Sequence, residues 1–290
     1  MMGAALRWAG WLVLAGTVTA GAQETGKPER PLPDVPALMH EVEAKQRAAE
    51  EARKDYIFHA VVTEVEVDGK GSPKKTEVKE YDDFWIKGVP VERLVKKDGR
   101  PLTEDEAKKE SERIDKEAAK ASERRAKEDA KGKETDPRGN DEVTVSRLLE
   151  LGSFTNARRV QMAGRDTIAV DYTGDPKAKT KNRFEGVIRD MAGTVWVDEQ
   201  DKAIARIEGR FVSSFKVGGG LMASIREGTN FNVQMTKVNG EVWLPARIEG
   251  KGEARALLFF KFNGSLTASY SDYRKFKTSS TIVGVGVVKE

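Results

Sequence analysis

The chain has 290 residues, with 50 basic and 47 acidic side chains, so its net charge of +3 is a small difference between two large numbers. Such a balance gives solubility and does not provide the concentrated positive charge that nucleic-acid binding requires. The sequence contains no cysteine, which excludes disulfides, thiolate metal sites and cysteine nucleophiles. A chain of this length can bury a hydrophobic core without covalent cross-links.

The first 22 residues have the layout of a secretory signal peptide. Arg7 precedes the apolar run Trp8–Val18, and Ala20–Ala22 offers a cleavage site of the small-x-small type. The apolar run is shorter than the roughly 20 residues that a membrane-spanning helix needs. We therefore expect export to the periplasm with cleavage, rather than a retained anchor. Residues 23–35 follow as a flexible leader rich in proline and polar residues.

A helix is predicted directly after the leader, at the start of a domain that we expect to cover residues 36–290. Asp34 can act as the N-cap, and Pro36 suits the first turn, where the missing N–H would have no helical partner. Large apolar residues occupy the first half of this helix and alanines the second half. We expect the helix to end near Asp55 and to pack strongly only through its first half.

A second helix is predicted over residues 103–131, within a charged insertion at 103–140. Thr103 and Glu106 form a capping-box signature at its start. Charges of both signs are interspersed along it, and Ile114 is its one large aliphatic residue. Without an apolar stripe to bury, the insertion is either a solvated helix or a docking arm for another protein.

Strands dominate the rest of the chain, as alternating segments separated by turn sequences. Asn239-Gly240 and Asn263-Gly264 are typical of two-residue hairpin turns. The stretch Ala203–Val217 alternates over its whole length, which predicts one strand of about 50 Å. No helices are available as crossovers between strands, so the sheet should be antiparallel. The predicted fold is α+β, mainly antiparallel β, a strongly curved incomplete β-barrel of about 10–11 strands with a few short helices.

Trp85, Trp196 and Trp243 each lie inside a predicted strand between two apolar neighbours. Adjacent strand residues point to opposite faces, so the sheet should be apolar on both sides at these points. A helix, a second subunit or a hydrophobic ligand must then cover the second face. Seven residues are therefore candidates for the lining of an apolar cavity: Trp85, Trp196, Phe231, Met235, Trp243, Phe260 and Phe262.

The sequence shows few signs of catalysis or metal binding. Its two histidines, His40 and His59, do not form the cluster that a zinc site needs. The acidic stretch Asp198–Asp201 lacks the glycine and the final glutamate of a reliable calcium loop, so we interpret it as a polar hairpin turn. Asp82 and Asp83 are consecutive in a strand and face apart, which prevents them from acting as an acid/base pair. We expect no enzymatic activity, no cofactor and no metal.

Several features together resemble one known family. They are the signal peptide, the leading helix, the antiparallel meander, the turn G-x-V-W-V-D at Gly193–Asp198 and the closing strand Y-x-D-Y-R-K-F at Tyr270–Phe276. This combination covers residues 36–67 and 193–276. It resembles the LolA/LolB-like periplasmic carriers that sort outer-membrane lipoproteins, and their RseB-like sensor relatives. The resemblance implies a half-barrel of about eleven strands with a helix-closed apolar cavity that holds acyl chains. The insertion at 103–140 departs from this pattern.

We accordingly expect a periplasmic, non-enzymatic carrier that shelters the acyl chains of a lipid or lipoprotein. The alternative is a sensor or regulatory module of the same fold that binds a membrane-bound partner through the charged helix. Two further alternatives are weaker. An outer-membrane barrel is disfavoured because charged residues make up 33% of the chain, and a hydrolase of envelope polymers lacks a recognisable nucleophile with its base. No nucleic acid is expected among the partners.

Overall fold

The structure, a computed structural model, describes residues 30–132, 144–217, 223–256 and 260–276. The chain divides into two units, residues 1–31 and residues 32–290. Only Arg30 and Pro31 of the first unit are described, so the predicted signal peptide lies outside the described residues. All the helices and strands considered below belong to the second unit.

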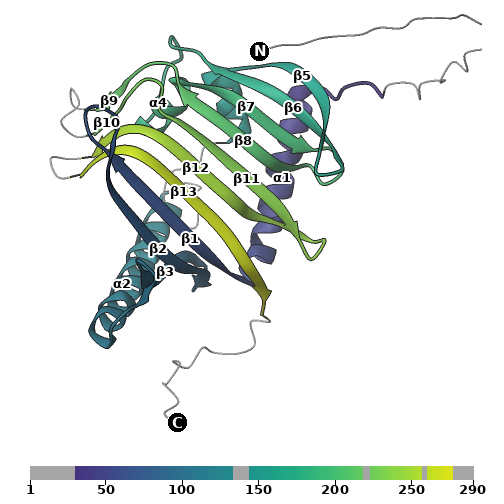
Figure 1. The fold of residues 1–290 in the computed structure, drawn as a ribbon. Coiled ribbons are helices and arrows are strands. Elements are labelled where there is room, and N and C mark those ends of the chain that lie inside the picture. The colour runs from purple at the N-terminus through teal and green to yellow at the C-terminus, as the bar shows by residue number, and fades with distance from the viewer. Residues whose placement is uncertain (1–29, 133–143, 218–222, 257–259, 277–290) are drawn as a thin grey trace, which may run out of the picture. The chain divides into compact units, whose positions relative to one another are not determined.

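A single antiparallel sheet of thirteen strands forms the body of this unit (Figure 1). Eleven strands follow one path in the order β4-β3-β2-β1-β13-β12-β11-β8-β7-β6-β5, while β10 pairs with β12 and β9. Along this path the two end strands, β4 and β5, do not pair with each other, so the sheet stays open. The predicted incomplete, mainly antiparallel barrel is confirmed. The strands are β1 (Tyr56–Val67), β2 (Pro73–Ile86), β3 (Val89–Lys97), β4 (Arg100–Pro101), β5 (Gly152–Met162), β6 (Arg165–Gly174), β7 (Met191–Asp198), β8 (Ala203–Phe211), β9 (Phe215–Val217), β10 (Ala223–Ile225), β11 (Asn230–Val238), β12 (Val242–Ala256) and β13 (Phe260–Lys275).

Four helices accompany the sheet: α1 (Val35–Arg53), α2 (Glu104–Asp129), α3 (Val145–Leu151) and α4 (Arg183–Arg189). The predicted caps are present. Asp34 accepts a hydrogen bond from the backbone N–H of Ala37 at 3.0 Å, and Thr103 and Glu106 form the full capping box of α2. None of the helices in the described ranges is long and apolar enough to cross a membrane.

Helix α2 differs from the expected stripe-free helix. Ile114, Ala118 and Ala121 are buried on one side of it and lie one helical turn apart. Ile114 and Ala121 pack with Phe84 of β2 and Val91 of β3. Small side chains let a helix approach a sheet closely, so two alanines and one isoleucine are enough to fix it. The prediction that this helix has no apolar stripe to bury was wrong, because it counted only large aliphatic residues.

Of the two predicted Asn-Gly hairpin turns, one is confirmed and the other was wrong. Asn239 and Gly240 both have positive φ, 51° and 71°, as a two-residue hairpin turn requires. Asn263 and Gly264 instead lie inside β13, opposite Glu253 and Gly252 of β12. A Cβ at Gly264 would lie 1.8 Å from the carbonyl oxygen of Val65, so this glycine serves a close approach of β1 rather than a turn.

The predicted long strand over Ala203–Val217 is divided. Strand β8 ends at Phe211 and β9 begins at Phe215. Between them, the N–H of Val212 donates to the carbonyl of Asp190, the residue that follows α4. The alternating pattern continues through this break, but the hydrogen bonds with neighbouring strands do not.

The register of the sheet places apolar residues in a row on one face. These seven residues are paired from strand to strand across β6, β7, β8, β11, β12, β13 and β1, and we call them the apolar row: Val170, Val195, Ile207, Val233, Ile248, Ala268 and Val62. The next residue along each strand points to the other face. Those residues form the polar row: Asp171, Thr194, Glu208, Asn232, Glu249, Thr267 and Thr63.

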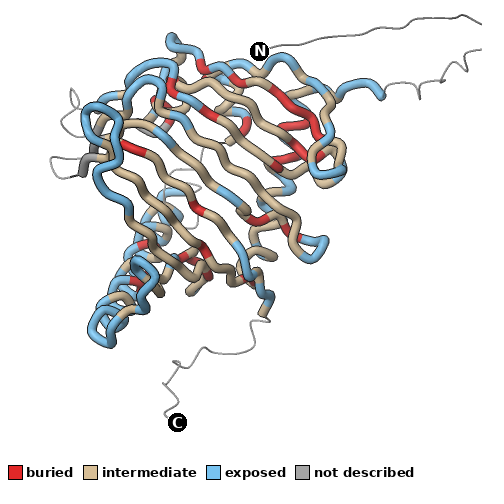
Figure 2. The backbone as a smooth tube through the Cα atoms, in the orientation of Figure 1, coloured by how far each residue is buried: buried red, intermediate tan, exposed pale blue. Residues whose placement is uncertain are grey.

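Helix α1 lies across the apolar face of the sheet, over β6, β7 and β8 (Figure 1). Its first half provides Leu38, Met39 and Val42, which are almost completely buried against Ile168 and Val197. Buried positions gather on these strands and around α2, whereas most of the middle of the sheet is only half-buried (Figure 2). The main core therefore lies under the first half of α1. Much of the apolar face is left uncovered by the other described parts of the chain.

Candidate functional site

The second half of α1 stands over a cavity in the apolar face. The helix contributes Ala48, Ala49 and Ala52, and the sheet contributes Ile207 and Met235. The cavity has a volume of about 390 Å³, which is near the lower end of the range for small-molecule sites, about 300–1,000 Å³. Large side chains fill the space beneath the first half of the helix, and alanines leave it open beneath the second half. The change from large to small residues along α1 thus produces the cavity.

Trp243 is a wall of this cavity and is held in place by a charged network. Its Nε1–H donates to Asp201 Oδ2 at 2.9 Å. Asp201 also accepts hydrogen bonds from Arg165 and Lys237, both at 2.9 Å, and the guanidinium of Arg165 lies 5.8 Å from the centre of the indole ring. The position of the indole is therefore fixed by Asp201 and Arg165, and Lys237 in turn holds Asp201.

The turn at Asp198–Asp201 supplies two of these carboxylates. Asp198 is buried and accepts hydrogen bonds from Arg165 and from the backbone N–H of Asp201. Burial acts to raise the pKa of Asp198, but these hydrogen bonds outweigh it and lower the pKa below the ordinary value. Both carboxylates thus take part in an ion-paired hairpin turn, and no group of three or more acidic or histidine ligands occurs among the described residues.

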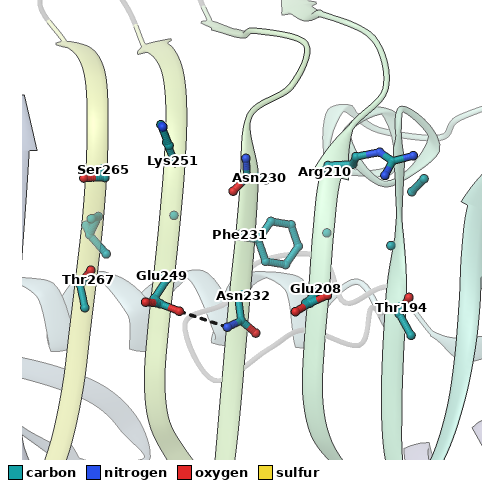
Figure 3. A pocket seen from close by; sticks show the side chains of 15 residues that line it. Thr194, Glu208, Arg210, Asn230, Phe231, Asn232, Glu249, Lys251, Ser265 and Thr267 are labelled. Atoms are coloured by element: carbon teal, nitrogen blue, oxygen red, sulfur yellow. Dashed lines mark hydrogen bonds between the residues drawn. The ribbon is translucent and has the colours of Figure 1, made fainter. Parts of the chain in front are cut away.

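Two further hollows lie along the sheet. One of about 280 Å³ is lined by Val62, Ile248 and Ala268 of the apolar row, with Tyr81 and Tyr270. Another of about 490 Å³ follows a register line that includes Gly193, Gly209 and Gly250, and Figure 3 shows the polar side chains on its border. Leu266 lines both hollows.

The ring of Phe231 occupies the space that a side chain at Gly209 would need. This ring lies between β11 and β8 (Figure 3), and a Cβ added to Gly209 would meet it at 2.4 Å. Asn232, the next residue, belongs to the polar row and donates to Glu249 at 3.2 Å. The apolar and polar surfaces are therefore separated by a single residue along the strand.

The structure distributes the seven predicted lining residues as follows. Met235 and Trp243 line the cavity under α1, and Phe231 lines the glycine-rich hollow. Trp196 lies on the opposite face, paired with Arg206, whose guanidinium stands 4.9 Å from its ring centre. The ring centre of Trp85 lies 5.9 Å from Nζ of Lys54. Phe262 is half-buried and pairs with Ala254 of β12. The side chain of Phe260 lies outside the described residues.

Sequence reasoning missed the helical side of the cavity and one cationic residue, Arg53. The signal was present, because the alanine-rich half of α1 was recognised as weakly packing. Whether alanines on a helix leave a cavity depends on the residues that face them. Here Ile204 and Ile207 face the alanines of α1, and strand pairing alone brings them there.

A second cluster that the sequence did not predict lies at the other end of the sheet. His59 Nδ1 is 3.0 Å from Asp82, its Nε2 is 3.1 Å from Glu80, and Lys96 donates to Glu80 at 2.9 Å. The hydrogen bond with Asp82 raises the pKa of His59, and burial opposes that rise only in part. Asp82 and Glu80 are two residues apart in β2, the spacing that puts both on one face. The cluster joins three strands through charge pairing.

No protein-family model and no curated protein sequence matches this chain. Three solved structures with similar folds are an outer membrane lipoprotein-sorting protein domain from Vibrio parahaemolyticus, a LolA superfamily protein from Nitrosomonas europaea and the MucA/MucB complex from Pseudomonas aeruginosa. Their sequence identities are 10%, 12% and 10% and their TM-scores 0.35, 0.26 and 0.23. The alignments cover 84%, 85% and 79% of this chain and 95%, 97% and 92% of those chains.

The first two of these structures bear the names of the lipoprotein-sorting group that the sequence resemblance indicates. Similarity at such identities and TM-scores does not extend to what this chain binds.

Proposed function

We propose that this protein is a non-enzymatic binding protein that shelters the acyl chain of a lipid or lipoprotein. The observation that carries the proposal is the cavity of about 390 Å³ between α1 and the apolar face. Aliphatic side chains, Met235 and the indole of Trp243 line it, together with five polar or charged residues, Lys45, Gln46, Arg53, Asp201 and Glu241. The half-buried remainder of the apolar row extends the apolar surface beyond the cavity.

Elementary energetics supports a container of this kind. Each buried CH₂ group is worth about 0.8 kcal/mol, so a sixteen-carbon chain has about 13 kcal/mol to gain from leaving water. An acyl chain that crosses an aqueous compartment therefore needs an apolar enclosure. The cavity and the apolar row provide such a surface.

We further propose that the protein works in the periplasm after removal of residues 1–22. The support is the arrangement of Arg7, the apolar run Trp8–Val18 and the cleavage site at Ala20–Ala22. Cell fractionation followed by N-terminal sequencing of the mature protein tests this directly. A mature chain in the periplasm that begins near Gln23 is expected, and a full-length chain in the cytoplasm would contradict it.

Fluorescence quenching tests where the acyl chain binds. A brominated fatty acid quenches an indole that it touches, and the mature chain keeps Trp85, Trp196 and Trp243. Two variants each keep one relevant indole: W85F/W196F retains Trp243 in the cavity, and W85F/W243F retains Trp196 on the opposite face. We expect strong, saturable quenching in the first variant and little in the second. Equal quenching, or none in either, would rule out acyl binding in this cavity.

The natural cargo can be identified independently. Organic extracts of protein purified from the periplasm should contain an acyl lipid when examined by mass spectrometry. The same extraction from the Ala49→Leu variant, in which a larger side chain fills the cavity, provides the control.

One observation favours a second candidate, a regulatory module that binds a membrane-bound partner. Helix α2 is 26 residues long, is anchored through Ile114, Ala118 and Ala121, and presents charged side chains on its exposed side. A fixed, charged helix suits a protein partner better than a solvated insertion does. Reversal of the exposed charges at Lys116 and Lys120 would then abolish partner capture while acyl binding persists.

A further inference from the structure

Arg53, the last residue of α1, lines the cavity under this helix. It differs from the other charged lining residues in having a buried donor without a partner in the described parts of the chain. Its side chain also lines a hollow of about 230 Å³ on the neighbouring side of α1. The Nε–H of Arg53 is buried and has no hydrogen-bond partner among the described residues. Burial lowers the pKa of Arg53, and the charge of Glu50 one turn earlier opposes this only in part.

The other charged groups of the cavity are differently arranged. Asp201 is paired with Arg165 and Lys237, and Glu241 is paired with Lys275 at 2.6 Å and with the hydroxyl of Tyr56. Lys45 also lines the cavity and is exposed. Both carboxylates are thus paired with protein cations, whereas the Nε–H of Arg53 at the end of the helix has no hydrogen-bond partner among the described residues.

A guanidinium carries five N–H donors and binds carboxylates and phosphates in a two-pronged manner. A buried donor without a partner is unfavourable, so the cavity as it stands is incomplete around Arg53. The position of Arg53 at the C-terminus of α1 gives a mild favourable interaction with the helix dipole, but this leaves the Nε–H unsatisfied.

We infer that Arg53 anchors the anionic head group of the bound amphiphile, a carboxylate or a phosphate, while the acyl chain occupies the cavity lined by Ile207, Met235 and Trp243. The inference rests on the proposed function and narrows it to acyl compounds with an acidic head group. Burial of the acyl chain drives binding, and the head group accepts the hydrogen bond that the Nε–H of Arg53 lacks.

The experiment compares ligands that share one chain and differ in the head group. Hexadecanoate, hexadecyl phosphate and hexadecan-1-ol are titrated into the mature protein at pH 8, with inorganic phosphate alone as the fourth probe. We expect the two anions to bind roughly tenfold more tightly than the alcohol, about 1.4 kcal/mol, and inorganic phosphate not to bind measurably.

Substitutions at Arg53 test the assignment. R53Q should remove the preference for the anions and leave the affinity for hexadecan-1-ol unchanged, which also shows that the cavity still folds. R53K should keep part of the preference. K120Q removes an equal charge from the exposed side of α2 and should change neither affinity.

The possible failures are distinct. If hexadecan-1-ol binds and the anions bind no more tightly, Arg53 is not an anchor, although the acyl-binding proposal stands. If R53Q weakens the alcohol and the anions equally, the effect is structural and the inference is wrong. If inorganic phosphate binds alone in an Arg53-dependent way, the site is an anion site without an acyl chain. If no acyl compound binds, the proposed function itself fails.

Discussion

The apolar row and the polar row cross the same seven strands and are one residue apart, yet they have opposite roles. Val233 on the apolar row faces the cavity under α1, whereas Asn232 on the polar row bonds Glu249 across the strand boundary. The same contrast separates Trp243, held inside the cavity, from Trp196, stacked with Arg206 on the other face. The apolar face holds the cavity under α1, whereas side chains of the polar row bond one another across neighbouring strands and border the hollow of about 490 Å³.

The largest expected effect comes from the filled part of the apolar face. Ile168 is fully buried beneath the first half of α1, and Ile168→Ala should destabilise the protein by about 2–5 kcal/mol because it leaves a cavity in close-packed surroundings. Chemical denaturation measures this. Ser271→Ala, an exposed position on the polar face opposite His59, should change stability by less than about 0.5 kcal/mol. Similar losses for both would remove the distinction between the faces.

The unfilled part of the same face should behave differently. Ala49→Leu places a larger side chain into the cavity under α1 and should weaken acyl binding by roughly tenfold or more, since small changes of volume are strongly felt in apolar sites. Stability should change little, because open space receives the added atoms. Ala44→Leu on the exposed side of the same helix is the matched control for helix propensity. Unchanged acyl affinity in the Ala49 variant would place the ligand elsewhere.

The two tryptophans sharpen the comparison further. Trp243→Phe removes the hydrogen bond to Asp201, which retains Arg165 and Lys237, so we expect a loss of about 1 kcal/mol. Trp196→Phe weakens only a half-exposed cation–π contact, worth about 0.5 kcal/mol. Denaturant midpoints of the two variants, compared at equal m-values, give both numbers. A larger loss at Trp196 would mean that the polar face has a packing role not seen in its contacts.

The smallest expected effect is the pH dependence of the polar face. The pKa of His59 is raised by its hydrogen bond to Asp82, so the protonated ring stabilises the folded state below the ordinary pKa of about 6.5. This stabilisation is lost as pH rises through the raised pKa. Urea denaturation at several pH values should show that slope in the wild type and not in His59→Gln. Identical slopes would show that the cluster contributes nothing measurable.

Much of the local structure could be predicted from the sequence. The caps at Asp34 and Thr103 and the turn at Asn239-Gly240 depend on the chemistry of neighbouring residues, which a short window contains. The same local reading was wrong at Asn263-Gly264, because the glycine there meets β1, almost 200 residues earlier in the chain. It was also wrong at Val212, where a hydrogen bond to Asp190 ends β8.

The candidate site could be predicted only in part from the sequence. Phe231, Met235 and Trp243 could be selected as large apolar side chains in strands, but nothing local distinguishes Trp196 from Trp243, since both have apolar neighbours. The register with Arg206 and the contact with Asp201 separate them. Arg53 appears in the sequence as an ordinary basic residue at a helix end, and only the burial of its Nε–H marks it out.

The sequence by itself determined the alternation of the strands, the ends of the main helices and the change from large residues to alanines along α1. These properties follow from local sterics and hydrogen bonding. The tertiary structure alone decided which strand pairs with which, which face each tryptophan takes and that the alanines of α1 lie over Ile207 and Met235. Those outcomes depend on contacts between residues far apart in the chain, and a cavity is a property of the space between them.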